Sequence, residues 1–176
     1  MELKITKQTN EKECGVCVLT SLHNYYYNDN LDKTEVLNRC NISETGTTIF
    51  DLENCAKEVG LELESYEVLF NEFCNLKINK IFILLIQSND GKHFVAAKKI
   101  KNGLLIFDSS YSKPKQISYK ELEKIFLNVL ILVDKKPNPL FKKIFTNISS
   151  LLMFDLKFVL LNIVIYCLCN VPKLCY

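Results

Sequence analysis

At 176 residues the chain is long enough for one ordinary domain and a short additional segment. Hydrophobic residues make up 48% and charged residues 24%, so most of the chain should fold rather than stay disordered. The net charge of +2 conceals an asymmetry, because residues 135–176 carry six basic and one acidic side chain. Residues 1–134 carry 16 basic and 19 acidic side chains and no basic face with interleaved aromatics, which argues against a nucleic-acid partner.

Three helices are predicted first, over residues 14–27, 31–40 and 47–60. Each has apolar residues at the spacing of one helix face. Thr47 or Thr48 can cap the third helix at its N-terminus, and Gly60 ends it.

The pattern then changes to that of strands. Alternating or continuous apolar runs predict strands over residues 61–69, 80–87, 93–100, 103–110 and 128–134, with one more helix at 118–126. Turn signals at Asn89-Asp90-Gly91 and Asn102-Gly103 make several of these strands antiparallel neighbours. Helices placed ahead of an antiparallel sheet indicate an α+β domain.

The stretch DKKPNP at residues 134–139 predicts a domain boundary. It separates a domain at 1–134 from a basic amphipathic linker at 135–147, a long apolar run at 148–169 and a tail at 170–176. The apolar run has the length of a transmembrane helix, although Asp155 and Lys157 interrupt it. The alternative is a helix buried by a partner.

Four lysines flank the start of that run, at positions 135, 136, 142 and 143. Basic residues beside a membrane segment favour the cytoplasmic side. We therefore expect a cell-membrane location, with residues 1–134 on the cytoplasmic side.

Eight cysteines raise the question of a disulfide framework. The N-terminal stretch MELKITKQTN has no apolar segment and cannot be a secretory signal. Cys40, Cys55 and Cys74 each stand alone in an ordinary segment. We expect reduced thiols in a cytosolic domain.

The pair Cys14-Gly15-Val16-Cys17 allows three interpretations. A redox dithiol would follow a buried strand, whereas the preceding KQTNEKE is polar. A structural zinc site needs four ligands, and residues 1–134 hold no second C-x-x-C or H-x-H, so we expect no metal. The third interpretation, a nucleophilic thiol, requires a histidine.

The chain has two histidines. His23 lies nine residues after Cys14 on the same predicted helix, which places it on the opposite side as a packing or surface residue. His93 begins a strand, and Asp108 ends the next strand of the same hairpin. A Cys, a His and an Asp that converge from a helix N-terminus and two adjacent strands have the geometry of a papain-like cysteine protease.

The chemistry of this set is coherent. A thiolate of Cys14 at a helix N-terminus is stabilised by the helix dipole, and a protonated His93 lowers the thiol pKa further. Asp108 would hold the imidazole tautomer, and Gln8 could donate its side-chain N–H to an oxyanion. We expect Gly15 to let the backbone approach a substrate closely. Cys17, one helical turn on, should pack inward.

These residues resemble the peptidase C39 family, the N-terminal domains of bacteriocin-processing ABC exporters. The stretch QTNEKECGVC resembles its cysteine signature, GTTIFDLENCAKEVGLELESY the helix and strand that follow, and GKHFVAAKKIKNGLLIFDSS the His and Asp strands. The likeness covers nearly all of residues 1–134. The family roles fall on Cys14, His93 and Asp108 as catalytic residues and on Gln8 as the oxyanion donor.

The resemblance implies a substrate and partners. Family members cleave bacteriocin-like precursors after a double-glycine leader while the attached ABC transporter exports the remainder, and they need no cofactor for the cleavage. Six membrane helices and an ATPase follow the family's peptidase domain. This chain has no G-x-x-x-x-G-K-[ST] loop, so we expect a fragment, one piece of a split exporter or a truncated product.

Two alternatives remain beside the peptidase. The first is a non-catalytic module that holds leader peptides for the transporter, and the second is a thioredoxin-like oxidoreductase. One local departure from the family is Ser109-Ser110, which follows Asp108 where the family usually has Pro. We expect this to loosen the turn slightly.

Overall fold

A computed structural model describes residues 2–40 and 46–136 of the chain. A short 3₁₀ turn at Glu11–Glu13 precedes the first helix. The helices are α1 (Cys14–Tyr27), α2 (Lys33–Arg39), α3 (Ile49–Glu58), α4 (Phe70–Asn75) and α5 (Tyr119–Glu123). The strands are β1 (Leu61–Glu67), β2 (Phe82–Ser88), β3 (Gly91–Ile100), β4 (Gly103–Phe107), β5 (Lys115–Ser118) and β6 (Phe126–Lys135).

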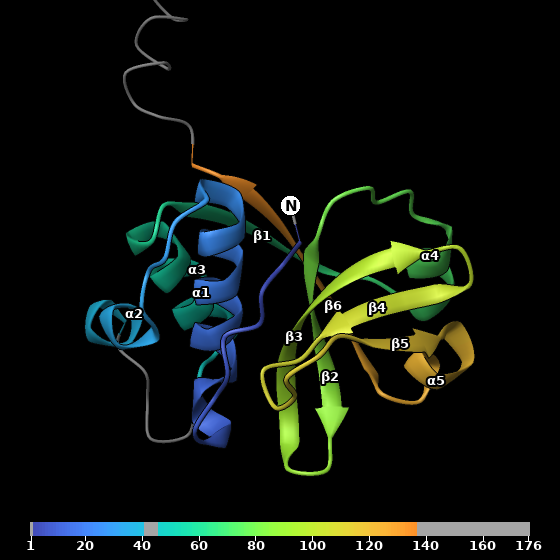
Figure 1. The fold of residues 1–176 in the computed structure, drawn as a ribbon. Helices are drawn as coiled ribbons and strands as arrows, with labels where there is room; N and C mark the ends of the chain where they lie inside the picture. Colours follow the sequence, from blue (N-terminus) through green and yellow to red (C-terminus); the bar gives the residue numbers. More distant parts are fainter. Residues whose placement is uncertain (1, 41–45, 137–176) are drawn as a thin grey trace, which may run out of the picture. The chain divides into compact units, whose positions relative to one another are not determined.

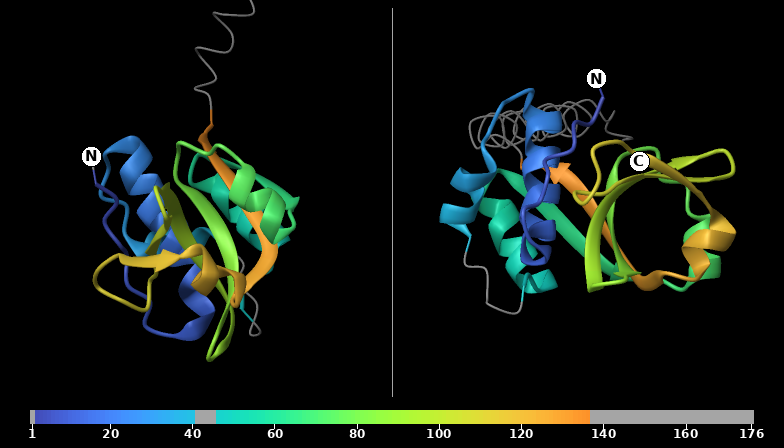
Figure 2. Two further views of the ribbon diagram at one scale, coloured as in Figure 1. Left: turned by 90° about the vertical axis from the view of Figure 1, so that its right-hand side faces the viewer. Right: turned by 60° about the horizontal axis from the view of Figure 1, so that its bottom comes forward.

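The strands form one sheet in the order β1-β6-β2-β3-β4-β5, and every neighbouring pair is antiparallel. Helices α1, α2 and α3 gather on one side of this sheet, while α4 and α5 lie on the other (Figure 1). The view from below in Figure 2 shows how β2 to β5 curl round toward α4 and α5. The predicted α+β class, with helices packed on an antiparallel sheet, is confirmed.

The continuous apolar run of β2 is explained by burial on both faces of the sheet. Ile83 and Leu85 belong to the core shared with α1 and α3. Phe82, Leu84 and Ile86 belong to the second core, which α4 and α5 cover. A strand covered on both faces reads as an uninterrupted apolar run rather than an alternating one.

The helix ends follow the predicted capping residues. Thr48 caps α3: its hydroxyl accepts a hydrogen bond from the backbone N–H of Asp51, whose carboxylate accepts one in return from the N–H of Thr48. Gly60 follows the end of α3 with φ of 76°, a backbone conformation that favours glycine. Helix α1 ends at Tyr27, and the next residue, Asn28, adopts the left-handed conformation with φ of 53°.

One expectation about the cysteines is wrong. Cys40 and Cys55 form a disulfide, with their Cα atoms 5.1 Å apart. The bond joins the residue after α2 to the middle of α3, two positions that become neighbours only when both helices pack on α1. Among the described cysteines, Cys14, Cys17 and Cys74 are free thiols.

The predicted boundary falls close to the end of the sheet. Strand β6 runs through Asp134 and ends at Lys135, and residues 1–136 form one compact unit. The predicted membrane segment at 148–169, the tail and the linker from residue 137 onward lie outside the described residues. Within the described part of the chain, no helix has the length and apolar character needed to cross a bilayer.

Candidate active site

The thiol of Cys14 lies at the first residue of α1, directly after the 3₁₀ turn. The residue is 5% exposed and lines a groove. It interacts with the side chain of His93 and with the backbone of Phe94 and Gly15. A thiolate in this position is stabilised by the positive end of the helix dipole and by N–H groups of the first turn.

His93 and Asp108 are brought together by the β3–β4 hairpin. The register pairs Ala96 with Phe107 at the end of β4. Asp108, the next residue, therefore lies beside the first half of β3, where His93 is located. His93 Nε2 lies 2.7 Å from Asp108 Oδ1. Since Nε2 is engaged there, Nδ1 is the ring nitrogen left to pair with Cys14.

The pKa values of the three groups shift in the directions of an ion pair. Burial opposes each charge, but the hydrogen bond and charge of His93 lower the pKa of Cys14 below its ordinary value of 9.0. Burial also opposes the imidazolium, yet the hydrogen bonds to Asp108 and Cys14 raise the pKa of His93 to about 9. The pKa of Asp108 is lowered, again against burial, by His93 and the backbone N–H of Ser110. All three shifts are in the direction of the charged forms: thiolate, imidazolium and carboxylate.

Gln8 reaches this cluster from the chain before α1. Its backbone N–H donates to the carbonyl of Ser109 over 3.1 Å. Its side-chain Oε1 accepts a hydrogen bond from the Ser109 hydroxyl over 2.7 Å. Gln8, His93 and Asp108 line one small cavity of about 110 Å³, so the structure brings together all four residues that the sequence singled out.

Glu13, to which the sequence assigned no role, holds the loop between Gln8 and Cys14. Its carboxylate accepts hydrogen bonds from Thr9 N, Asn10 Nδ2 and Lys33 Nζ over 2.9, 2.8 and 2.7 Å. Burial alone would raise the pKa of Glu13, but the hydrogen bonds from Lys33 and Thr9 and the charge of Lys33 lower it to about 2. The position of Glu13 directly before Cys14 was a visible signal in the sequence. Nothing in the sequence indicated its partner Lys33, which lies 20 residues away.

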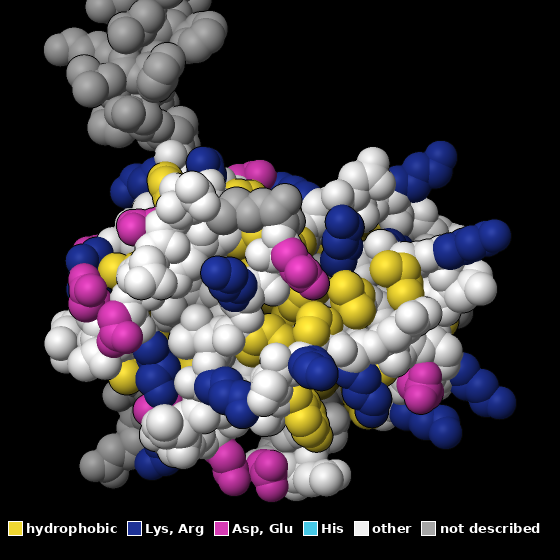
Figure 3. Space-filling view, in the orientation of Figure 1, with side chains coloured by type: hydrophobic (Ala, Val, Ile, Leu, Met, Phe, Trp, Pro, Cys, Tyr) yellow, Lys and Arg dark blue, Asp and Glu magenta, His cyan; other side chains and the backbone are white. Residues whose placement is uncertain are grey.

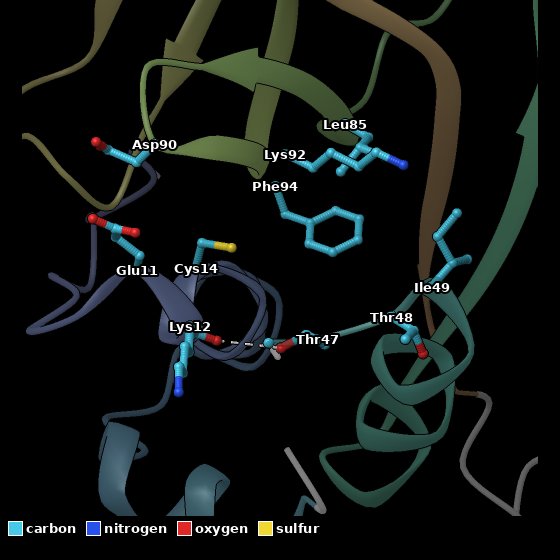
Figure 4. A pocket seen from close by; sticks show the side chains of 11 residues that line it. Glu11, Lys12, Cys14, Thr47, Thr48, Ile49, Leu85, Asp90, Lys92 and Phe94 are labelled. Carbon is cyan, nitrogen blue, oxygen red and sulfur yellow. Dashed lines mark hydrogen bonds between the residues drawn. The ribbon is translucent and has the colours of Figure 1, made fainter. Parts of the chain in front are cut away.

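A groove of about 790 Å³ runs past Cys14, between the helices and the sheet (Figure 4). Thr47 and Ile49 at the start of α3 form one wall, and Leu85 and Phe94 form the other. Figure 4 shows the sulfur of Cys14 directed toward the β3 side of this groove. Charged side chains of Glu11, Lys12, Asp90 and Lys92 also line it, so the groove offers both apolar and polar contacts.

Gly15 has a packing role. A Cβ atom at this position would lie 2.9 Å from Leu52 Cδ1 and 3.1 Å from Thr47 Cγ2, so the missing side chain makes room for these residues, while the close approach of a substrate stays a prediction. This packing places the start of α3, and with it one wall of the groove, beside Cys14.

Cys17 and His23 do not line the groove. Cys17 is 0% exposed, and burial raises its pKa to about 12, so the structure does not favour a redox pair with Cys14. His23 donates from Nδ1 to the carbonyl of Val59 over 2.7 Å and stacks on Tyr27, which confirms that it is a packing residue.

The turn after Asp108 is also tighter than expected. The backbone N–H of Ser110 donates to Asp108 Oδ1 over 2.8 Å, and that of Tyr111 donates to the Asp108 carbonyl over 3.0 Å. The two serines therefore do not loosen the turn. Ser109 is 2% exposed.

Two further features describe the surroundings of the site. Among residues 2–40 and 46–136, no group of three or more His, Cys, Asp or Glu side chains is placed to hold a metal ion. On the face seen in Figure 3, basic side chains are dispersed among acidic and uncharged ones, and apolar side chains gather near the centre.

The fold and the site together define a class of domain: an α+β unit that holds a thiol, an imidazole and a carboxylate at the N-terminus of a buried helix. The chain belongs to the peptidase C39 family, whose model matches residues 2–138.

Two curated relatives are similar over the same region. A Mycoplasma pneumoniae protein described as a putative ABC transporter ATP-binding MG390 homolog is 33% identical over 134 residues, and its Mycoplasma genitalium counterpart is 29% identical over 134 residues. Each match covers 76% of this chain but 19% of the relative. The chain thus spans about a fifth of the length of these transporters.

Solved structures show the same fold. The peptidase domain of Streptococcus ComA, described as a bi-functional ABC transporter, matches with a TM-score of 0.67 at 21% identity, over 76% of this chain and 99% of that domain. A double glycine motif protease from an AMS/PCAT transporter, solved in complex with its leader peptide, matches with a TM-score of 0.65 at 21% identity, over 76% of this chain and 92% of that one.

Proposed function

We propose that this chain is a cysteine endopeptidase that cleaves double-glycine leader peptides from bacteriocin-like precursors, coupled to ABC-type export. The observation that carries the proposal is the connected set of Cys14, His93 and Asp108, with a lowered thiol pKa and a raised imidazole pKa. A packing role alone gives no reason for a charged pair at the edge of a groove.

In the proposed mechanism the Cys14 thiolate attacks the scissile carbonyl carbon. The side-chain N–H of Gln8 and the backbone N–H of Cys14 stabilise the oxyanion of the tetrahedral intermediate. His93 donates its proton to the leaving amine, and then, as a neutral base, takes a proton from the water that hydrolyses the thioester. Asp108 keeps the imidazole in the tautomer and orientation that both steps need.

The depth of the thiol supports the substrate class. Cys14 is 5% exposed, so residues of little bulk beside the scissile bond would ease the approach of the carbonyl to its sulfur. Two glycines meet this condition because they have no side chains. The apolar groove walls formed by Leu85 and Phe94 suit apolar side chains farther along the leader.

We also propose the partners and the location. The relatives at the sequence level are described as ABC transporters, and they are about five times as long as the matched region. The membrane and ATPase parts would lie on this chain's own continuation or on another chain. The peptidase domain would then work on the cytoplasmic side of the membrane, where precursors are made.

The test is cleavage of a synthetic precursor with a double-glycine leader by the full chain, followed by mass spectrometry. We expect one cut after the second glycine, absent in Cys14→Ala and retained in Cys17→Ala, the matched control on the same helix. Binding of the peptide without cleavage would instead favour the non-catalytic docking module, and cleavage that survives Cys14→Ala would refute the proposed nucleophile.

A further inference from the structure

Ser109 is a buried polar residue that the proposed mechanism does not yet use. It is 2% exposed, and its hydroxyl donates to Gln8 Oε1 over 2.7 Å, across a separation of 101 residues. Its carbonyl accepts the backbone N–H of Gln8 over 3.1 Å. Two hydrogen bonds thus tie both ends of Gln8 to one residue.

In the structure the Ser109 hydroxyl bonds to the acceptor end of the carboxamide, Oε1. An amide side chain has an acceptor oxygen and a donor nitrogen on opposite sides, and a rotation by half a turn exchanges them. With Oε1 held by Ser109, Nε2 is the end left for the cavity that Gln8 shares with His93 and Asp108. The opposite orientation would present a carbonyl oxygen to a developing negative charge, which is repulsive.

We propose that Ser109 is the positioning residue of the oxyanion donor: its hydroxyl holds the Gln8 carboxamide in the donor orientation. This inference rests on the proposed peptidase function and adds a specific role to one more residue. Because Ser109 follows Asp108 directly, a single turn would orient both the imidazole, through Asp108, and the oxyanion donor, through Ser109.

A role of the Ser109 hydroxyl in holding the turn together can be distinguished from a role in positioning Gln8. The turn has hydrogen bonds of its own, from the N–H of Ser110 to Asp108 Oδ1 and from the N–H of Tyr111 to the Asp108 carbonyl. Removing the Ser109 hydroxyl leaves these bonds and the His93–Asp108 contact in place. The thiolate should therefore keep its reactivity while the tetrahedral intermediate loses stabilisation.

The test uses the full chain and a double-glycine precursor peptide. We expect Ser109→Ala to lower kcat about tenfold with little change in KM, since one neutral hydrogen bond is lost. Gln8→Ala should lower kcat about 100-fold, and the double variant should be no slower than Gln8→Ala, because both changes act on one donor. Ser109→Thr keeps the hydroxyl and should restore activity, while Ser112→Ala, an exposed serine of the same loop, is the matched control.

Alkylation of Cys14 by iodoacetamide supplies the second readout, because that reaction forms no oxyanion. Its rate should be the same in Ser109→Ala and in the unmodified chain. A wild-type kcat in Ser109→Ala, multiplicative losses in the double variant, or a parallel loss of alkylation rate would each overturn the proposal.

A third readout separates this inference from the proposed function. In the full chain labelled with ¹⁵N, the side-chain amide signals of Gln8, assigned by their loss in Gln8→Ala, should shift in Ser109→Ala and not in Ser112→Ala. If the unmodified chain cleaves no peptide, the proposed peptidase function is refuted. Ser109 then has no role in catalysis either, whatever the amide signals show. If the chain cleaves but the amide signals do not move, only the positioning role of Ser109 is overturned.

Discussion

Cys14 and Cys17 lie one turn apart on α1, yet the regions around them give the two thiols opposite properties. Cys14 faces the β3–β4 hairpin, and its pKa is lowered by His93. Cys17 is 0% exposed, lies near Lys33 and Glu13, and has its pKa raised to about 12 by burial. The same helix therefore supplies one thiol with a lowered pKa and one with a raised pKa, and the difference comes from the neighbouring residues and not from the helix itself.

The largest expected effect is on activity and separates the two regions directly. Cys14→Ala should lower kcat/KM on a double-glycine precursor by about 10⁴-fold or more, because it removes the nucleophile. Cys17→Ala should stay within about threefold, because this side chain touches neither the groove nor His93. Comparable losses in both variants would mean that the thiols act as a pair, as an oxidoreductase requires.

The next effect concerns the helical region. Reducing the Cys40–Cys55 bond should lower the free energy of unfolding by about 3 kcal/mol, as the chain-entropy relation gives for a loop of 15 residues. Urea unfolding with and without dithiothreitol measures it, and the Cys40→Ser/Cys55→Ser variant should show no response to the reductant. Peptide mapping that finds no linked Cys40 and Cys55 fragments would contradict the bond.

A smaller effect comes from the loop before α1. The folded-state pKa of Glu13, about 2, lies below its ordinary 4.5, so the carboxylate contributes stability above about pH 4.5 and loses it as the pH falls through 2. Glu13→Gln keeps the shape and some hydrogen bonds, and should cost about 2 kcal/mol at pH 7. Urea unfolding at pH 7 and pH 2 should show this cost only at the higher pH. The exposed neighbour Glu11, changed to Gln, is the control, and equal costs at both pH values would contradict the assignment.

The smallest effect is a shift in the pH profile and tests the hairpin region. The pKa of His93 is raised from 6.5 to about 9, so the stability that its positive charge contributes is fully present below pH 6.5 and is lost as the pH rises through 9. Asp108→Asn keeps the hydrogen bond but removes the charge, and the alkaline limb of kcat/KM should move from near 9 toward 6.5. At pH 8 the rate should fall about tenfold, with little change at pH 6. An unmoved limb would show that Asp108 does not hold the imidazolium.

The fold was predictable where each element carries its own signal. The apolar spacing and the Thr48 cap identify α1 and α3, and the apolar run identifies β2. Helix α4 was missed because it is short and its support is remote: the Lys99 ammonium donates to the carbonyls of Cys74 and Leu76 over 3.1 and 2.7 Å. Strand β5 was missed because its residues are mostly polar and it forms by pairing with β4.

The sequence by itself determined which residue types are available at the site and in which order, and this was enough to single out Gln8, Cys14, His93 and Asp108. The tertiary structure decided what their neighbours do. It turned Gly15 toward α3, joined Cys40 to Cys55, and placed Ser109 on Gln8. The physical reason is that hydrogen bonds and packing contacts act over a few ångströms in space, so partners far apart in the chain leave no pattern in the sequence between them.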